Sequence, residues 1–282
     1  MVARSLSERC LDSLVGGFIA AARQAGGVND DSGDIDGGDG TAAAADIGDC
    51  HESGDTDWQA VFWDIGGVLL DVDSARDSHR RFAETLVETY DLSLPIDEAL
   101  ETWRSEVGRH FHEREGTEFR SSRVAYEQAV AAVVGESVPT DEWEPLFYRV
   151  QRETLRPNPG AVETVERLGE TDLHVGVVSD IDTAEARLIF DTFGLADAFD
   201  SVTTSESVGW TKPDPAMFEA ALAAADASPE TALMVGDRYE HDIAGAADAG
   251  LATVAYGAEN GPAVDYRVTD LREILDIVGV DR

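Results

Sequence analysis

The sequence predicts an α/β protein in which a doubly wound parallel sheet carries an inserted α-helical cap. Short apolar segments with the length of buried strands lie at residues 59–63, 173–178, 232–235 and 251–255. Helical patterns follow them, and such alternation is typical of a parallel sheet covered on both faces. The segment 73–155 has no comparable strand and interrupts the pattern after the first strand, which predicts the cap.

The helices follow from apolar residues at helical spacing. Around the sheet they are expected at about 160–169, 183–193, 214–225, 240–249 and 270–278. In the inserted segment they are expected at roughly 76–90, 97–112, 121–134 and 141–154. Two prolines in the sequence RPNPG, Pro157 and Pro159, mark the return to the sheet. The predicted domains are therefore a core of 58–72 with 156–282 and a cap of 73–155.

Residues 1–57 have a different character from the rest of the chain. Apolar residues between Leu11 and Ala22 recur at helical spacing and predict a short amphipathic helix. Residues 26–57 are rich in Gly, Asp, Ser and Ala, which is the composition of a disordered acidic linker. No apolar run reaches the roughly 18 residues of a membrane-spanning helix, so none is expected.

The composition excludes several kinds of partner. Lys and Arg total 21 against 57 for Asp and Glu, and 21 − 57 gives a net charge of −36. Such a charge argues against binding nucleic acid or an anionic membrane, because both need clustered cations. The two cysteines are too few for a disulfide scaffold and are typical of a reducing cytosol, so we expect a cytoplasmic protein.

Lysine is almost absent, since Lys212 is the only one among the 21 basic residues. An acidic, lysine-poor chain resembles proteins that work in molar internal salt, where the Debye length is only about 3 Å and self-repulsion is weak. We therefore predict a halophilic protein. The retained Lys212 stands in GWTKPDP, where an ammonium group could balance clustered carboxylates and a phosphate, although a surface lysine retained by chance is the simpler alternative.

Polar residues stand where the predicted strands end. Asp64 follows the first strand, Ser179 the second and Asp237 the third. Parallel sheets bind ligands beyond the carboxyl ends of their strands, so these side chains are expected to share one crevice. Each could instead cap a helix. Asp64 could act as a nucleophile or ligate a cation, and the hydroxyl of Ser179 suits a phosphate oxygen.

Asp237 and Asp242 lie in VGDRYEHDIAGAADAG, around the start of the helix after the third strand. Together with Asp64 they predict an acidic cluster, which is unfavourable unless a cation fills it. Mg²⁺ prefers such oxygen ligands and often adds water and a substrate phosphate to them. The sequence therefore predicts a magnesium site.

The segments WDIGGVLLD, VVSD, GWTKPDP and VGDRYEHDIAGAADAG occur in the order and spacing of the haloacid dehalogenase (HAD)-like hydrolase superfamily, and the resemblance covers about residues 58–282. The inserted segment resembles the small α-helical cap of one group, on a Rossmann-like core. The resemblance implies a Mg²⁺-dependent phosphatase that forms an aspartyl-phosphate on Asp64. It implies phosphate binding by Ser179, Asp180 and Gly67, and orientation of nucleophile and phosphate by Lys212. The implied metal ligands are Asp64, the backbone carbonyl of Gly66, Asp237 and, directly or through water, Asp242.

Two residues depart from the family pattern. Gly66 stands where most family phosphatases carry an aspartate that serves as general acid and base, a role worth about 10²–10⁴ in rate. Without this acid, the substrate must have a good leaving group, another residue must donate the proton, or the enzyme is very slow. Some family members with this glycine resemble sugar-phosphate phosphatases. Asp180 stands where asparagine is common, which puts an extra carboxylate near the phosphate.

Four alternatives follow from the same motifs. A 2-haloacid dehalogenase also lacks the acid, but it needs no metal, so Asp237 and Asp242 would be surplus. A catalytically impaired protein that binds a phosphorylated ligand would explain Gly66, but not the retained nucleophile. Phosphonoacetaldehyde hydrolysis needs a cap lysine that this chain lacks, and phosphosugar mutases depend on the missing acid.

The cap is expected to select the substrate. Its basic residues could meet sugar hydroxyls or a second anion, or simply lie on solvated helix faces; they are His110, His112, Arg114, Arg120 and Arg123. The histidines do not form a full zinc ligand set, so no zinc is predicted. We expect a small phosphorylated metabolite as substrate, a monomer or homodimer, and no nucleic-acid or membrane partner.

Overall fold

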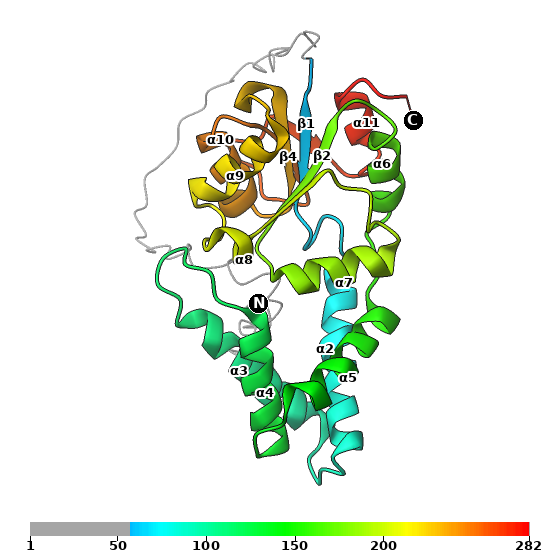
Figure 1. Cartoon of the computed structure of the whole chain (residues 1–282), viewed down its shortest axis with the longest axis vertical. Helices are drawn as coiled ribbons and strands as arrows, with labels where there is room; N and C mark the ends of the chain where they lie inside the picture. The colour runs from blue at the N-terminus through cyan, green and yellow to red at the C-terminus, as the bar shows by residue number, and fades with distance from the viewer. Residues whose placement is uncertain (1–56, 282) are drawn as a thin grey trace, which may run out of the picture.

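The structure is a computed structural model, and it describes residues 57–281. Its centre is a six-stranded sheet in the order β3-β2-β1-β4-β5-β6, and every neighbouring pair is parallel. The strands are β1 Ala60–Trp63, β2 His174–Ser179, β3 Ser201–Thr204, β4 Ala232–Gly236, β5 Ala252–Tyr256 and β6 Tyr266–Val268. The predicted doubly wound parallel sheet is confirmed (Figure 1).

Alternate residues of the central strand face opposite sides of the sheet, as the pleat requires. Val61 and Trp63 pack with one apolar cluster, which includes residues of α6, α7 and α11. Ala60 and Phe62 pack with a second cluster, which includes residues of α9 and α10. The bounds of these helices and of two short ones are α6 Ala161–Leu168, α7 Thr183–Phe193, α8 Ser205–Val208, α9 Pro215–Ala225, α10 Gly245–Asp248, α11 Glu273–Ile277 and the 3₁₀ turn Pro229–Thr231.

Four helices follow β1 and form the lower part of the molecule in Figure 1: α2 Val72–Thr89, α3 Ile96–His112, α4 Ser122–Val134 and α5 Thr140–Thr154. They enclose an apolar cluster of their own, in which Trp103 stacks on Tyr126 at 5.4 Å between ring centroids. Phe82 meets Trp103 edge-on at 5.1 Å. This packing is what an inserted cap requires, while the boundaries at 73 and 155 stay a prediction.

Two strands were not expected from the sequence. β3 and β6 are the edges of the sheet, and each is only partly buried. Their sequences, SVTT and YRV, mix polar with apolar residues, because an edge strand needs burial along one side only. The continuous apolar run that reveals a central strand is therefore missing from both.

The helix expected at 240–249 begins instead as a π-helical turn, Tyr239–Ala244, and continues as α10. The wide turn starts where the backbone N–H of Arg238 donates to Asp242 Oδ2 at 2.9 Å. Asp242 packs so closely under Gly236 that a Cβ on this glycine would lie 2.2 Å from the Asp242 Cβ. π-helical turns often occur at functional sites. Here the turn brings Asp242 back to the end of β4.

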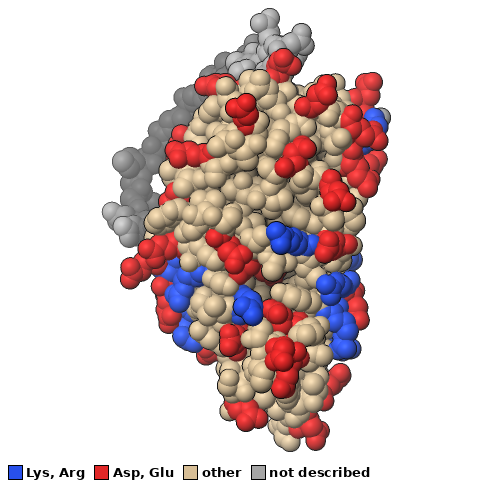
Figure 2. All heavy atoms as spheres, viewed as in Figure 1, with Lys and Arg blue, Asp and Glu red and all other residues tan. Residues whose placement is uncertain are grey.

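Acidic side chains are spread over both parts of the molecule. Figure 2 shows Asp and Glu over the whole visible face, whereas most of the Lys and Arg lie in its lower half. In the described part of the chain, no helix combines the length and hydropathy needed to cross a bilayer. The amphipathic helix and linker predicted within 1–57 lie outside the described residues, apart from residue 57.

Candidate active site

The carboxyl ends of three adjacent strands bring the predicted residues together. β1 pairs with β2 on one side and with β4 on the other. Asp64 directly follows β1, Ser179 is the last residue of β2, and Asp237 directly follows β4. The backbone N–H of Asp64 donates to Val235 O of β4 at 3.0 Å, which continues the ladder as far as Asp64. The site therefore lies at the topological switch point of the sheet, where the chain connections run in opposite directions on the two sides of β1.

Lys212 is fully buried beneath this edge, so it is not a surface lysine. Its Nζ lies 3.0 Å from Asp64 Oδ1 and 2.7 Å from Asp242 Oδ1. The same Nζ donates to the carbonyl of Val178 at 2.9 Å. The ammonium group therefore has one hydrogen bond to the backbone and two close carboxylate neighbours. Burial lowers the pKa of Lys212, but Asp242 and Asp64 outweigh it and raise the pKa, so the group stays charged.

The pKa values of the two acids that contact Lys212 are shifted in opposite directions. Asp64 Oδ1 accepts from Lys212 and from the N–H of Ile65 at 2.8 Å. Burial raises the pKa of Asp64, and this outweighs the lowering by Lys212. Burial also acts to raise the pKa of Asp242, but Lys212 and Arg238 lower it to about 2. Asp242 is thus the permanently charged anchor of Lys212.

Gly67 lets Asp237 approach the turn after β1. Its φ is +77°, a left-handed conformation that glycine adopts without strain. A Cβ at this position would lie 2.1 Å from Asp237 Oδ2. Asp237 Oδ1 is buried and has no hydrogen-bond partner among the described residues. Burial, together with Asp242 and Asp64, raises the pKa of Asp237 to about 8.

Arg238 is a site residue that the sequence analysis missed. Its Nη2 lies 2.9 Å from Asp180 Oδ2, 3.5 Å from Asp242 Oδ1 and 4.0 Å from Asp64 Oδ2. Only 6% of this side chain is exposed. The available signals were its place between Asp237 and Asp242 and the unusual carboxylate of Asp180, which needs a positive partner near a phosphate.

Both oxygens of Asp180 are engaged by the protein. Oδ1 accepts from the backbone N–H of Lys212 at 2.7 Å, and Oδ2 pairs with Arg238. His241 lies at the edge of the same group, with its Nδ1 2.7 Å from the carbonyl of Lys212. Burial and Arg238 lower the pKa of His241. Asp180 is therefore placed to organise its cationic neighbours.

The strand-end cluster, defined as Asp64, Asp180, Asp237 and Asp242 with Lys212 and Arg238, is short of positive charge. When all four carboxylates are ionised, the two cations leave two negative charges unbalanced in a buried place, in line with the raised pKa values of Asp64 and Asp237. Oxygens of Asp64, Asp237 and Asp242 lie within 4.8 Å of one another. A divalent cation with oxygen ligands would balance this charge and use the unpartnered oxygen of Asp237, so the residues fit Mg²⁺.

The basic residues predicted in the cap divide into two groups. Arg114 reaches the site, because its Nη1 donates to Thr211 Oγ1, next to Lys212, at 3.2 Å. Arg120 pairs with Glu113 and Arg123 with Glu144, in partly exposed contacts. His110 is buried, and neither of its ring nitrogens has a partner among the described residues. Only Arg114 thus touches the segment that carries the site.

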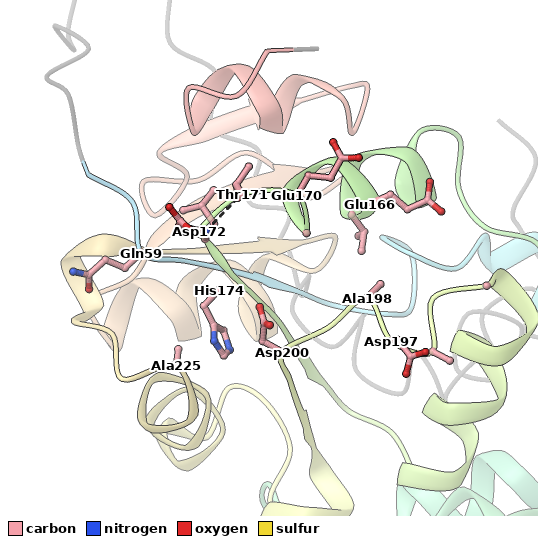
Figure 3. Close-up of a pocket in the computed structure, with 15 residues that line it drawn as sticks. Gln59, Glu166, Glu170, Thr171, Asp172, His174, Asp197, Ala198, Asp200 and Ala225 are labelled. Carbon is pink, nitrogen blue, oxygen red and sulfur yellow. Dashed lines mark hydrogen bonds between the residues drawn. The ribbon is translucent and has the colours of Figure 1, made fainter.

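A hollow of about 800 Å³ lies near the start of β1 and β2, away from the strand-end cluster. Figure 3 shows His174 and Asp200 beside it, while the carboxylates of Glu166 and Glu170 point outward. His174 Nε2 lies 2.7 Å from Ser201 Oγ, and Asp200 accepts from the N–H of Val175. These side chains form hydrogen bonds with neighbouring residues of the sheet and do not converge on a common point. We therefore do not take this hollow as the candidate active site.

Comparisons with known proteins identify the family of the chain. The family model described as haloacid dehalogenase-like hydrolase matches residues 58–250. Glyceraldehyde 3-phosphate phosphatase of Methanothermobacter thermautotrophicus is 29% identical over 71% of this chain and 86% of that protein. Ribulose-1,5-bisphosphate 5-phosphatase of Halopiger xanaduensis is 28% identical over 78% of this chain and 98% of that protein.

A solved structure shows the same fold. The HAD phosphatase from Thermococcus onnurineus superposes with a TM-score of 0.60 at 25% identity, and the match covers 79% of this chain and 99% of that one. The family model spans both the strand-end cluster and the four inserted helices. The chain belongs to the haloacid dehalogenase-like hydrolase family, and it is a hydrolase.

Proposed function

We propose that this hydrolase is a Mg²⁺-dependent phosphatase that removes phosphate from a small phosphomonoester through an aspartyl-phosphate on Asp64. One observation carries the proposal. Asp64 Oδ1 is held by Lys212 and the N–H of Ile65, whereas the contact recorded for Oδ2 within residues 57–281 is the more distant Arg238, at 4.0 Å. One oxygen of a buried carboxylate is thus fixed, and the other is left for a substrate.

The chain's own residues would perform a two-step exchange. Asp64 Oδ2 forms a bond to phosphorus while the bond from phosphorus to the leaving oxygen breaks. Water then attacks phosphorus and releases a proton to solvent, which balances the proton that the leaving oxygen took up in the first step; the bond to Asp64 breaks, and inorganic phosphate leaves. Lys212 holds the carboxylate in position in both steps, and Ser179 supplies a hydroxyl beside the phosphate. Gly66 offers no proton to the leaving oxygen, which favours substrates that leave readily.

The metal ligands that we propose are Asp64, Asp237 and the carbonyl of Gly66. Bound Mg²⁺ supplies positive charge that offsets the charge of the phosphate and of the carboxylates. Both oxygens of Asp242 already contact the protein, at Lys212 and at the N–H of Arg238. We therefore place Asp242 as the anchor of Lys212 that reaches the ion through water.

The substrate class follows from the relatives and from Gly66. The two relatives above are named for a triose phosphate and a pentulose bisphosphate. A sugar phosphate would suit a site whose cap contributes Arg114 beside the Lys212 segment. Sugar phosphates are therefore the first substrates to test.

The decisive experiment measures phosphate release from p-nitrophenyl phosphate and from a sugar-phosphate panel that includes those two compounds. It is run in molar KCl with Mg²⁺ or with EDTA. Asp64→Asn should lower kcat by about 10⁴-fold or more, as loss of a nucleophile does elsewhere. Asp197→Asn, an exposed substitution elsewhere on the core, is the matched control and should keep wild-type activity.

Two outcomes would contradict the proposal. Activity that persists in Asp64→Asn would exclude the covalent route. Absence of turnover on every phosphate would favour a 2-haloacid dehalogenase or a protein that only binds a phosphorylated ligand. Chloride release from 2-chloropropionate would then distinguish these two.

We also propose a cytoplasmic, salt-adapted protein that is a monomer or homodimer. The support is the net charge of −36 and the single lysine. Circular dichroism should show loss of secondary structure when the protein is dialysed from molar KCl to low salt, because screening of the acidic surface is then removed. A fold that is stable at low salt would refute the salt adaptation. Size-exclusion chromatography in molar KCl would give the oligomeric state.

A further inference from the structure

Arg238 is a buried arginine held at both ends. Its backbone N–H donates to Asp242 Oδ2 at 2.9 Å, and its Nη2 pairs with Asp180 Oδ2 at 2.9 Å. These contacts direct the guanidinium over the carboxyl end of β1, between the turn after β4 and the end of β2. The side chain is 6% exposed, so water satisfies little of it.

The guanidinium retains a donor without an acceptor. Nε of Arg238 is buried and has no hydrogen-bond partner among the described residues. Nη2 lies 4.0 Å from Asp64 Oδ2, which is beyond hydrogen-bond distance but close enough for an intervening group to touch both. A buried, unpaired donor is unfavourable unless a ligand or water fills its place.

We infer that Arg238 contacts the phosphoryl group bound at Asp64 Oδ2, and that Asp180 is a positioning residue that acts through Arg238. The inference rests on the proposed phosphatase function. A planar guanidinium can give two hydrogen bonds to a phosphoryl group, and fixed positive charge at the reacting phosphorus lowers the barrier. The Nζ of Lys212 is held within the protein, because it lies against Asp64 and Asp242 and donates to the carbonyl of Val178.

The substitution Asp180→Asn separates the two contacts of Asp180. An asparagine oxygen can still accept from the backbone N–H of Lys212, as Oδ1 does now at 2.7 Å. Its amide nitrogen would face Arg238 donor to donor, so the ion pair would be lost. Although asparagine is the residue common in the family here, we expect Asp180→Asn to impair this chain.

The test is a double-mutant cycle of Asp180→Asn and Arg238→Gln in molar KCl with Mg²⁺. Arg238→Gln should lower kcat/KM for p-nitrophenyl phosphate by about 10²–10³, the effect of losing one charge-stabilising donor. Asp180→Asn should lower it by about tenfold or more, and the double variant should match Arg238→Gln alone within about threefold, because one interaction is removed once. Arg167→Gln, an exposed arginine paired with Glu170, is the matched control.

Binding gives a readout that a purely structural role would not move. Calorimetric titration with orthovanadate should show weaker binding to Arg238→Gln and Asp180→Asn by factors similar to the losses in kcat/KM, with unchanged circular dichroism. Arg238→Lys keeps the charge without the planar fork and should recover only part of the loss.

Several results would overturn the inference. Independent, multiplicative losses in the double variant would mean that Asp180 does not act through Arg238. Equal or tighter vanadate binding by Arg238→Gln would mean that the arginine only occupies the place of the phosphate. A wild type without phosphatase activity would instead refute the proposed function, whereas an active wild type with an unaffected Arg238→Gln refutes this inference alone.

Discussion

Two buried groups of carboxylates in this protein have opposite surroundings. The strand-end cluster includes the cations Lys212 and Arg238, which lie directly against its acids. The second group, Asp182 and Glu185 at the start of α7, accepts its side-chain hydrogen bonds from neutral donors in the described part of the chain. We call this second group the cap joint, because α7 lies along the boundary between the sheet and the inserted helices (Figure 1).

The cap joint fastens α4 and α5 to the core. Asp182 accepts from Ser121 Oγ at 2.5 Å and from the N–H and Oγ of Ser122 at 2.7 and 2.6 Å. Glu185 accepts from Tyr126 Oη and from Gln151 Nε2, both at 3.3 Å. Burial and then Asp182 raise the pKa of Glu185 to about 8.

The difference lies in what neutralises the buried charge. At the cap joint a proton on Glu185 removes the charge of that carboxylate, and its hydrogen bonds make a structural contact. At the strand ends Lys212 and Arg238 balance two of the four carboxylates, and the raised pKa values of Asp64 and Asp237 show that the other two need a proton or a cation. Burial raises carboxylate pKa values in both places, so it is the fixed counter-charges that distinguish a site suited to chemistry from a joint.

Removing Lys212 should have the largest effect on the difference between the strand-end cluster and the cap joint. Lys212→Met keeps much of the volume but leaves Asp64 and Asp242 without their shared partner. We expect phosphatase activity to fall by about 10³-fold and stability by about 3 kcal/mol or more, as for other broken buried pairs. Glu185→Gln, at the cap joint, should keep activity within about threefold. Comparable activity losses in the two variants would refute the distinction.

Gly67→Ala tests how closely the strand-end cluster is packed. The new Cβ would collide with Asp237 Oδ2, and φ is +77°. We expect roughly tenfold lower activity and a higher Mg²⁺ requirement, with about 1 kcal/mol of backbone cost. Gly194→Ala is a close control, because φ there is +75° but nothing lies within 4 Å of the added atom. If both variants bind Mg²⁺ equally well, the contact with Asp237 does not matter.

Glu185→Gln sharpens the comparison through the pH dependence of stability. The folded pKa of Glu185, about 8, lies above its usual value of 4.5, so the folded state binds an extra proton between these pH values. Glu185 therefore lowers stability progressively as pH rises through this window. Glutamine mimics the neutral acid, so the variant should match the wild type below about pH 4.5.

Above pH 8 the same variant should be more stable than the wild type by on the order of 1–3 kcal/mol. Chemical denaturation in molar KCl at several pH values would measure the difference. The exposed Glu170→Gln substitution should show no such trend. Parallel curves for the wild type and Glu185→Gln would mean that Glu185 is charged at the cap joint.

Most of the fold could be read from local patterns. The four buried strands were predicted to within one residue at each end, and α7 matched its predicted range of 183–193. Continuous apolar runs and helical spacing are local properties, so they appear directly in the sequence. The edges β3 and β6 and the π turn at Tyr239–Ala244 depend on neighbours distant in the chain, and local patterns did not reveal them.

The sequence by itself determined the parallel sheet, the inserted helices and which acids stand at the strand ends. The positions of the strands and their parallel order place the acids that follow them at the same edge of the sheet. Only the tertiary structure decided how the charges pair. Asp180 and Arg238 are 58 residues apart, and their ion pair exists because β2 and β4 flank β1. Pairing across a sheet depends on distances of a few ångströms between remote segments, and that information arises only when the chain has folded.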